Sequence, residues 1–321
     1  MKPRILVTRR LPPRVEALAG ERFQLRLNPE DRVLAPDEIV ARAVEYKADG
    51  LLVCLTDRLP KEAIEALPAS VRAIATVSVG FDHIDLAAAR ARGIAVTYVP
   101  EAVTEATADL ALLLLLAACR RAHEYQALMR RGEWAGWTAW KNLGTDPGGK
   151  VLGIVGMGRI GRAVAKRARA FGMIIHYHQR TPLPQAIADD AVYHSSLESL
   201  FRASAIVSLH TPSTPETRGF INARSLAWLA EGAILINTAR GDQVNDDDLI
   251  AALASGRLAA AGLDVFAGEP AFDRRYLELS NAYLLPHIGT STTETRDHMG
   301  FEAIDDLEAV LAGRQPRWRL A

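Results

Sequence analysis

The sequence Val151-Leu-Gly-Ile-Val155 runs directly into Gly156-Met157-Gly158-Arg159-Ile160-Gly161. A short apolar run therefore leads into a GxGxxG loop, and residues 162–171 continue it with the amphipathic pattern of a helix. In this order the first glycine permits a tight turn, the second lets a pyrophosphate approach the backbone, and the third allows close helix packing. The helix N-terminus adds free N–H groups and partial positive charge. The stretch predicts a dinucleotide-binding βαβ unit, with a purely structural glycine turn as the alternative.

Outward from this loop, short apolar runs alternate with helical patterns, which predicts parallel α/β architecture. The expected strands form two series, suggesting two sheets: residues 5–7, 51–55, 73–77 and 94–97, then 151–155, 173–177, 205–209, 233–237, 260–263 and 283–285. Between the series we expect a Leu-rich helix over about 101–121 and an irregular connection over 132–149. A last helical pattern covers about 292–311.

Length and charge limit the classes of protein that fit. The 321 residues suggest two domains, and 38 basic against 38 acidic residues give no net charge to attract nucleic acid or an anionic membrane. The longest apolar run, 110–119, is about half of the ~20 residues that a membrane span needs. No secretory signal, disulfide framework or zinc-spaced Cys/His cluster is evident, and Cys54 and Cys119 lie in apolar segments. A cytoplasmic protein without a metal site is expected.

The residues after the second strand of the nucleotide unit bear on the choice of cofactor. An Asp or Glu normally binds the adenosine ribose of NAD there, whereas this chain has His178-Gln179-Arg180-Thr181. Without a carboxylate to repel it, a 2′-phosphate could be bound by Arg180 and Thr181. NADP is therefore predicted as the preferred cofactor, NAD remaining possible. The alternative is that Arg180 stacks on adenine or points to solvent.

Three later segments each follow an expected strand and carry Arg240, Glu269 and His287. The carboxyl ends of parallel strands converge, so these residues could meet there. Arg can bind the carboxylate of a 2-oxo acid, and His can protonate its carbonyl oxygen as hydride arrives. A carboxylate beside the imidazole favours its protonated form. Taken singly, each residue could instead be a loop ion pair, a turn carboxylate or a cap. The other seven histidines fit less well, His83 because it begins a helical pattern.

At these residues the chain resembles the D-isomer-specific 2-hydroxyacid dehydrogenases, most closely their glyoxylate/hydroxypyruvate reductase branch. The matching motifs span residues 78–295 in the family's order: Ser78-Val-Gly-Phe-Asp-His-Ile-Asp85, Thr104-Glu-Ala-Thr-Ala-Asp109, the glycine loop, Leu209-His-Thr-Pro212, Asn237 to Gly241, Gly262 to Pro270, and Pro286 to Gly289. Together they are very specific, whereas the first fifty residues match only in general pattern.

The resemblance implies two Rossmann-like or flavodoxin-like parallel-sheet domains with the active-site cleft between them. Residues 1–99 with 287–321 would form a discontinuous substrate domain, and residues 100–286 the dinucleotide-binding Rossmann domain. A homodimer is implied as well, formed in part by the long apolar helix after Pro100, whose alternative is purely intradomain packing.

The resemblance also implies roles for particular residues. Arg240, Glu269 and His287 would be the catalytic trio, and the backbone N–H groups of Val79 and Gly80 would help hold the substrate carboxylate. Trp140 is the candidate that would reach the partner's substrate pocket. The cofactor would contact residues spread over the nucleotide domain: Thr107, Gly156, Gly158, Arg159, Ile160, Gly161, His178, Gln179, Arg180, Thr181, Thr211, Pro212, Thr238, Asp264 and Gly289.

The predicted function is reduction of glyoxylate and hydroxypyruvate to 2-hydroxy acids, in the cytoplasm. One departure weakens the substrate assignment, because Ala271-Phe272 stand where the family usually has Leu-Pro. Other activities on the same scaffold are 2-ketogluconate reductase, D-lactate-type, phosphite and formate dehydrogenase. A protein of another class, an NAD(H)-sensing corepressor, would share the fold and cofactor site, although this chain lacks the long tails expected of one.

Overall fold

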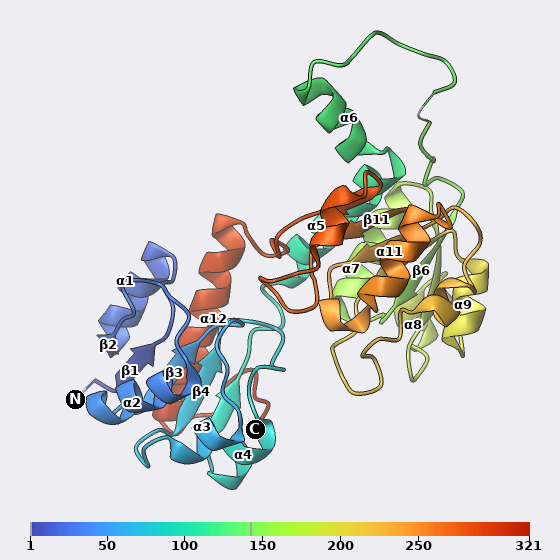
Figure 1. Cartoon of the computed structure of the whole chain (residues 1–321). Helices are drawn as coiled ribbons and strands as arrows, with labels where there is room; N and C mark the ends of the chain where they lie inside the picture. Colours follow the sequence, from blue (N-terminus) through green and yellow to red (C-terminus); the bar gives the residue numbers. More distant parts are fainter. Residues whose placement is uncertain (1, 142) are drawn as a thin grey trace. The chain divides into compact units, whose positions relative to one another are not determined.

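The computed structural model describes residues 2–141 and 143–321, and these divide into two compact units. One unit comprises Met1–Val103 and Thr290–Ala321, and the other comprises Thr104–Gly289 (Figure 1). Each unit is built on its own sheet, and every strand pairing within the two sheets is parallel. The predicted fold class, two parallel-sheet α/β domains, is confirmed.

The first unit holds a five-stranded sheet in the order β2-β1-β3-β4-β5. Its strands are β1 (Arg4–Val7), β2 (Gln24–Arg26), β3 (Gly50–Val53), β4 (Ala73–Thr76) and β5 (Ala95–Thr97), and its helices are α1 (Pro13–Arg22), α2 (Pro36–Tyr46), α3 (Lys61–Ala66), α4 (Leu86–Ala91) and α12 (Thr293–Leu311). The central strands are buried along their whole length, which explains why they appear in the sequence as continuous apolar runs.

The last helix, α12, completes this unit although it comes from the far end of the chain (Figure 1). It packs on β3, β4 and α1. Gly50 in β3 leaves room for the Leu307 side chain, and Gly300 lets α12 approach Val15 of α1. The carboxylate of Asp306 then accepts the N–H groups of Arg317 and Trp318 at 2.6 and 3.1 Å, which fixes the chain beyond the helix.

The second unit holds a seven-stranded sheet in the order β12-β11-β10-β9-β6-β7-β8. Its strands are β6 (Val151–Val155), β7 (Ile174–His178), β8 (Val192–His194), β9 (Ile206–Leu209), β10 (Ala233–Asn237), β11 (Leu258–Leu263) and β12 (Ala282–Leu284); its helices are α5 (Thr104–Cys119), α6 (Ala122–Arg130), α7 (Arg159–Ala170), α8 (Gln185–Ala188), α9 (Leu197–Ala203), α10 (Ala223–Leu226) and α11 (Asp246–Ala254). Strand order reverses between β6 and β9, the switch point where such sheets bind ligands.

Several predicted elements need correction. The helix expected over 101–121 begins at Thr104 and ends at Cys119, because Arg121 adopts a left-handed conformation and a separate helix, α6, follows. The three-residue edge strands β2 and β8 were not predicted, being too short to show a pattern. His83 does not begin a helix, since α4 starts at Leu86 and the preceding residues form turns. The described residues between 132 and 149 contain no helix or strand, as predicted.

None of the helices in residues 2–141 and 143–321 has both the length and the apolar character to cross a membrane. In the same ranges, no three His, Cys, Asp or Glu side chains are grouped as metal ligands would be.

The two glycines within helices of the first unit give a matched test of the packing. A Cβ on Gly300 would lie 2.3 Å from Cγ1 of the buried, stiff Val15, so Gly300→Ala should cost about 1–3 kcal/mol of unfolding free energy. A Cβ on Gly20 of α1 meets nothing within 4 Å, so Gly20→Ala should gain about 0.5–1 kcal/mol. Urea unfolding of both variants measures the two signs, and equal effects would contradict the packing of α12 on α1.

Candidate active site

The glycine loop follows β6 and turns the chain into α7 at the switch point of the sheet. Gly156 has a φ of 95°, and a Cβ there would lie 2.8 Å from the carbonyl oxygen of His210. A Cβ on Gly161 would lie 2.1 Å from the carbonyl oxygen of Gly156, so the first turn of α7 lies directly against the end of β6. Side chains at either position are therefore excluded by backbone atoms.

Gly158 differs from its two neighbours, because a Cβ there would point into open space. It is the N-cap of α7 and gives that helix no side-chain cap, so the first turn keeps N–H groups that lack an intrahelical partner. Within the described residues, the buried Thr238 hydroxyl also has no hydrogen-bond partner. An open backbone cradle at a helix N-terminus and a spare buried hydroxyl fit a dinucleotide with its pyrophosphate on α7.

The residues at the end of β7 form the rim beside this loop. Gln179 accepts the N–H of Met157 through Oε1 at 3.2 Å and donates from Nε2 to the carbonyl of Thr181 at 2.6 Å. His178 donates from Nδ1 to the carbonyl of His194 at 2.8 Å. Arg180 is exposed. The pKa of Glu216 is held below its usual range mainly by a hydrogen bond from Thr214, and the charge of Arg180 contributes to this lowering. This rim therefore presents a cation and no carboxylate of its own strand.

Arg240 is held in a turn that follows β10. The Asn237 amide donates to the carbonyl of Arg240 at 3.0 Å and accepts the N–H of Ala239 at 2.9 Å, which closes the turn. Gly241 comes next, and a Cβ there would lie only 1.8 Å from the carbonyl carbon of Phe266. The Arg240 turn thus lies against the loop that carries Glu269.

Glu269 and His287 form a hydrogen-bonded pair. Oε2 of Glu269 lies 2.7 Å from Nδ1 of His287, and Oε1 accepts the N–H of Phe266 at 2.6 Å. Burial alone would raise the pKa of Glu269, but the hydrogen bond from His287, the Phe266 N–H and the charge of Arg240 bring it below its ordinary value. Glu269 is therefore an anion at neutral pH. Its contact with Nδ1 leaves Nε2 as the imidazole atom that can exchange a proton with a substrate.

Asp264 fixes the backbone that carries His287. Its carboxylate accepts the N–H groups of Ile288 and Gly289, both at 2.8 Å, and its carbonyl accepts the N–H of His287 at 2.9 Å. These bonds hold His287 at a φ of 56°, a left-handed conformation that a non-glycine residue adopts only when its surroundings impose it. Burial raises the pKa of Asp264 to about 6 against the effect of these donors.

The remaining predicted residues lie in different surroundings. Thr107 is buried, and a Cβ on Gly289 would lie 3.7 Å from its hydroxyl. Trp140 is 73% exposed, with Nζ of Lys141 5.1 Å from its ring. Val79 and Gly80 belong to the first unit, and within the described residues neither backbone N–H has an intramolecular acceptor.

The sequence reasoning missed one residue of this region, Gln243. Its side chain is fully buried and donates to the carbonyls of Thr211 and Pro212 at 2.9 and 3.1 Å. These are two of the predicted cofactor contacts. Its only signal in the sequence is an amide in the turn that follows Arg240, which is too common a feature to single it out.

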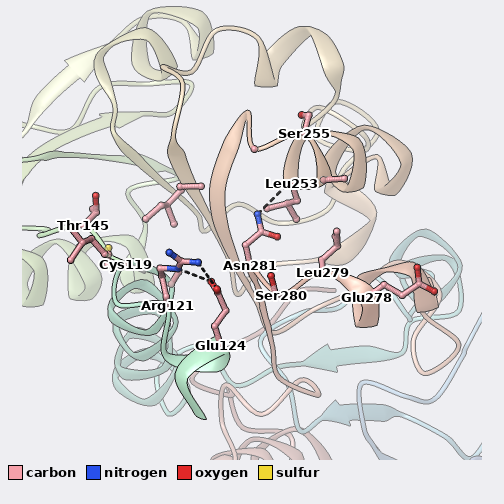
Figure 2. Close-up of a pocket in the computed structure, with 17 residues that line it drawn as sticks. Cys119, Arg121, Glu124, Thr145, Leu253, Ser255, Glu278, Leu279, Ser280 and Asn281 are labelled. Atoms are coloured by element: carbon pink, nitrogen blue, oxygen red, sulfur yellow. Dashed lines mark hydrogen bonds and ion pairs between the residues drawn. The ribbon is translucent and has the colours of Figure 1, made fainter. Parts of the chain in front are cut away.

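A cavity of about 600 Å³ lies elsewhere in the second unit, at the start of strands β10 to β12 (Figure 2). Its walls include Cys119, Asn281 and the ion pair of Arg121 with Glu124, whose atoms are 2.5 Å apart. The carboxyl ends of the strands carry the glycine loop, Arg240 and Asp264. The hollow therefore contains none of the predicted site residues.

Comparison with known proteins places these observations in a family. The NAD binding domain of the D-isomer specific 2-hydroxyacid dehydrogenases matches residues 112–289. A glycerate dehydrogenase from Hyphomicrobium methylovorum is 43% identical over 100% of this chain and 99% of its own length. A glyoxylate reductase from Thermococcus litoralis is 41% identical over 98% and 96%. The structure of an NADPH-dependent glyoxylate/hydroxypyruvate reductase from Sinorhizobium meliloti with NADP and malonate superposes with a TM-score of 0.89, 33% identity and coverage of 100% and 97%.

The glycines of the loop separate folding from cofactor binding. Gly161→Ala should lower the unfolding free energy by about 1–3 kcal/mol, because its methyl group meets backbone that cannot move aside. Gly158→Ala should unfold like the wild type but bind NADPH more than about tenfold more weakly, since the methyl group occupies the open cradle. Thermal unfolding and fluorescence titration with NADPH measure both. Full NADPH affinity in a folded Gly158→Ala protein would contradict this cofactor site.

Proposed function

The chain belongs to the D-isomer specific 2-hydroxyacid dehydrogenases, NAD(P)-dependent oxidoreductases, and from this we propose that it reduces glyoxylate and hydroxypyruvate to 2-hydroxy acids. The observation that carries the proposal is the Glu269–His287 pair, held by Asp264 beside the Arg240 turn. The same sheet edge carries the glycine loop. The proposed acid His287, the cation Arg240 and the glycine loop that would hold the cofactor thus belong to one edge of one sheet.

His287 is the proton donor in this proposal. A bound nicotinamide dinucleotide supplies the hydride to the substrate carbonyl carbon. Nε2 of His287 gives its proton to the carbonyl oxygen, and the anionic Glu269 stabilises the imidazolium before transfer and fixes the ring through Nδ1. Arg240 binds the substrate carboxylate through its guanidinium. In the reverse direction the neutral His287 accepts the hydroxyl proton.

The first unit is proposed as the substrate-binding domain and the second as the dinucleotide-binding domain. The N–H groups of Val79 and Gly80 would donate to the substrate carboxylate, and their lack of an acceptor within the described residues supports this role. The dinucleotide would be held by the residues predicted from the sequence, including Thr238 with its spare hydroxyl and the backbone of Thr211 and Pro212.

NADP is the proposed preferred cofactor. Arg180 and Thr181 are exposed beside the glycine loop, and Gln179 stands where an NAD-binding acid would repel a 2′-phosphate. The S. meliloti relative, whose structure contains NADP, supports the proposal.

A cytoplasmic homodimer is the proposed form of the enzyme. Both cysteines are free thiols, in keeping with a reducing compartment. Helix α6 has no buried residue, and large apolar side chains are exposed on it and on the connection that follows: Tyr125, Met129, Trp134, Trp137, Trp140 and Leu143. Such a surface is suited to burial by a second copy, and Trp140 would then contribute to the partner's substrate pocket.

Kinetics with NADPH and a panel of 2-oxo acids test the function. We expect turnover of glyoxylate and hydroxypyruvate, and His287→Asn should lower kcat by about 10²–10⁴-fold without loss of NADPH binding. Glu269→Gln should lower kcat for reduction, because the imidazolium loses the anionic partner that stabilises it before proton transfer. The kcat for oxidation of the hydroxy acid, in which His287 starts as the neutral imidazole, should fall less.

His298→Asn, at an exposed position of α12, is the matched control and should behave as the wild type. Absence of turnover across the panel with either NADPH or NADH would overturn the proposed function. Turnover that survives in His287→Asn would remove His287 from the role of acid.

The cofactor preference rests on one side chain that can be changed alone. Arg180→Gln should raise the KM for NADPH about 10- to 100-fold, the range expected for losing a charge-assisted hydrogen bond, and leave the KM for NADH nearly unchanged. Arg202→Gln on α9 is the matched control for the loss of an exposed arginine. Equal effects on both cofactors would contradict a 2′-phosphate site at Arg180.

A further inference from the structure

Three buried polar side chains lie beneath the loop that follows β4. Nε2 of His83 lies 3.0 Å from the hydroxyl of Thr76, and the Thr76 hydroxyl lies 2.7 Å from that of Ser78. The Ser78 hydroxyl donates to the carbonyl of Gly80 at 2.6 Å. The exposed fractions of Thr76, Ser78 and His83 are 0, 6 and 4%, so water does not replace these bonds.

The acceptor at the end of this chain fixes its direction. A carbonyl only accepts, so the Ser78 hydrogen is used on Gly80 and the Ser78 oxygen must accept from Thr76. The single hydrogen of Thr76 is then used on Ser78, and the Thr76 oxygen must accept from His83. The Ser78 and Thr76 hydroxyls supply the hydrogens for two of the three contacts. The third contact, between His83 and Thr76, is a hydrogen bond only if Nε2 of His83 carries a hydrogen.

The bond from Ser78 to Gly80 spans the part of the backbone that the proposed function uses. It closes a ring around the two peptide units whose N–H groups belong to Val79 and Gly80. The ring is anchored to the segment that follows the neighbouring strand β5, because the Val99 N–H donates to the carbonyl of Ser78 at 3.1 Å. With both ends fixed, the two N–H groups keep one orientation.

We propose that His83 is a positioning residue that acts through Thr76 and Ser78 to hold the Val79 and Gly80 N–H groups in the orientation that binds a substrate carboxylate. The proposal rests on the proposed function, because it takes these two N–H groups as carboxylate donors. His83 does not touch the substrate or the cofactor in this role. It supplies the hydrogen that makes the buried chain unidirectional, so that the loop is fixed before the anion arrives.

Thr76→Val removes the middle hydroxyl of this chain of hydrogen bonds and changes the shape of the side chain little. We expect this variant to raise the KM for glyoxylate roughly 3- to 30-fold, the range for a buried hydrogen bond left incomplete, with kcat and the KM for NADPH within about twofold. Thr76→Ser keeps the hydroxyl and should restore the wild-type KM. His83→Phe should raise the KM similarly, and the double variant Thr76→Val with His83→Phe should be no worse than either alone.

Thr97→Val is the matched control. Thr97 is a buried threonine on the adjacent strand β5, paired with Ala75, and its hydroxyl has no hydrogen-bond partner among the described residues. The KM should therefore not change. If the wild type reduces glyoxylate and Thr76→Val keeps its KM, or loses kcat and NADPH binding equally, the positioning role is overturned while the proposed function stands. A wild type without oxo-acid turnover overturns the proposed function instead.

The hydrogen on His83 can be observed in the unmodified protein. ¹⁵N spectra of the histidine-labelled chain, with the His83 signals assigned by their loss in His83→Asn, should show a protonated Nε2. This measurement does not depend on turnover or on the stability of a variant. A ring with Nε2 unprotonated would overturn the proposal.

Discussion

The second unit depends on the contact between the end of β6 and the first turn of α7. Only 2.1 Å would separate a Cβ on Gly161 from the carbonyl oxygen of Gly156, so the helix approaches the strand as closely as two backbones allow. This approach sets the direction of the helix N-terminus, whose first N–H groups lack an intrahelical partner, at the switch point of the sheet. The open space at Gly158, where an added Cβ would meet nothing within 4 Å, is therefore a consequence of backbone packing.

Polar side chains near the other strand ends form hydrogen bonds with one another and with the nearby backbone. Asp264 holds the His287 backbone, Glu269 holds the His287 ring, and Asn237 closes the Arg240 turn. In the first unit, His83, Thr76 and Ser78 hold the Gly80 carbonyl in the same manner. Each group that could contact a substrate is thus supported by hydrogen bonds from residues that do not, which keeps its geometry in place before binding.

The sequence predicted the long elements and missed the short ones for a physical reason. Strands such as β6 and β10 are continuous apolar runs because both faces are buried, and they were predicted with the observed bounds. The edge strands β2 and β8 have three residues each, too few for a pattern. Helix α6 buries none of its residues, so it does not pack an apolar face into the core of its unit.

The histidines show where pattern reasoning ends. His287 was singled out by its place after a strand, and it lies against Glu269. His83 was set aside as the start of a helix, although it lies in a turn with its ring against Thr76. Its surroundings depend on residues on either side of a turn, and no periodicity reports such a contact.

By itself, the sequence determined the family, the parallel α/β class and the residue types available for hydride chemistry, because these follow from local patterns and from motifs in fixed order. The tertiary structure alone decided which side chains meet. It paired Glu269 with His287 across eighteen residues, bound Asp264 to the backbone N–H groups that follow His287, and joined His83 to Gly80 through two hydroxyls. Hydrogen bonds of this kind require a distance and a direction in space, which spacing along a chain does not supply.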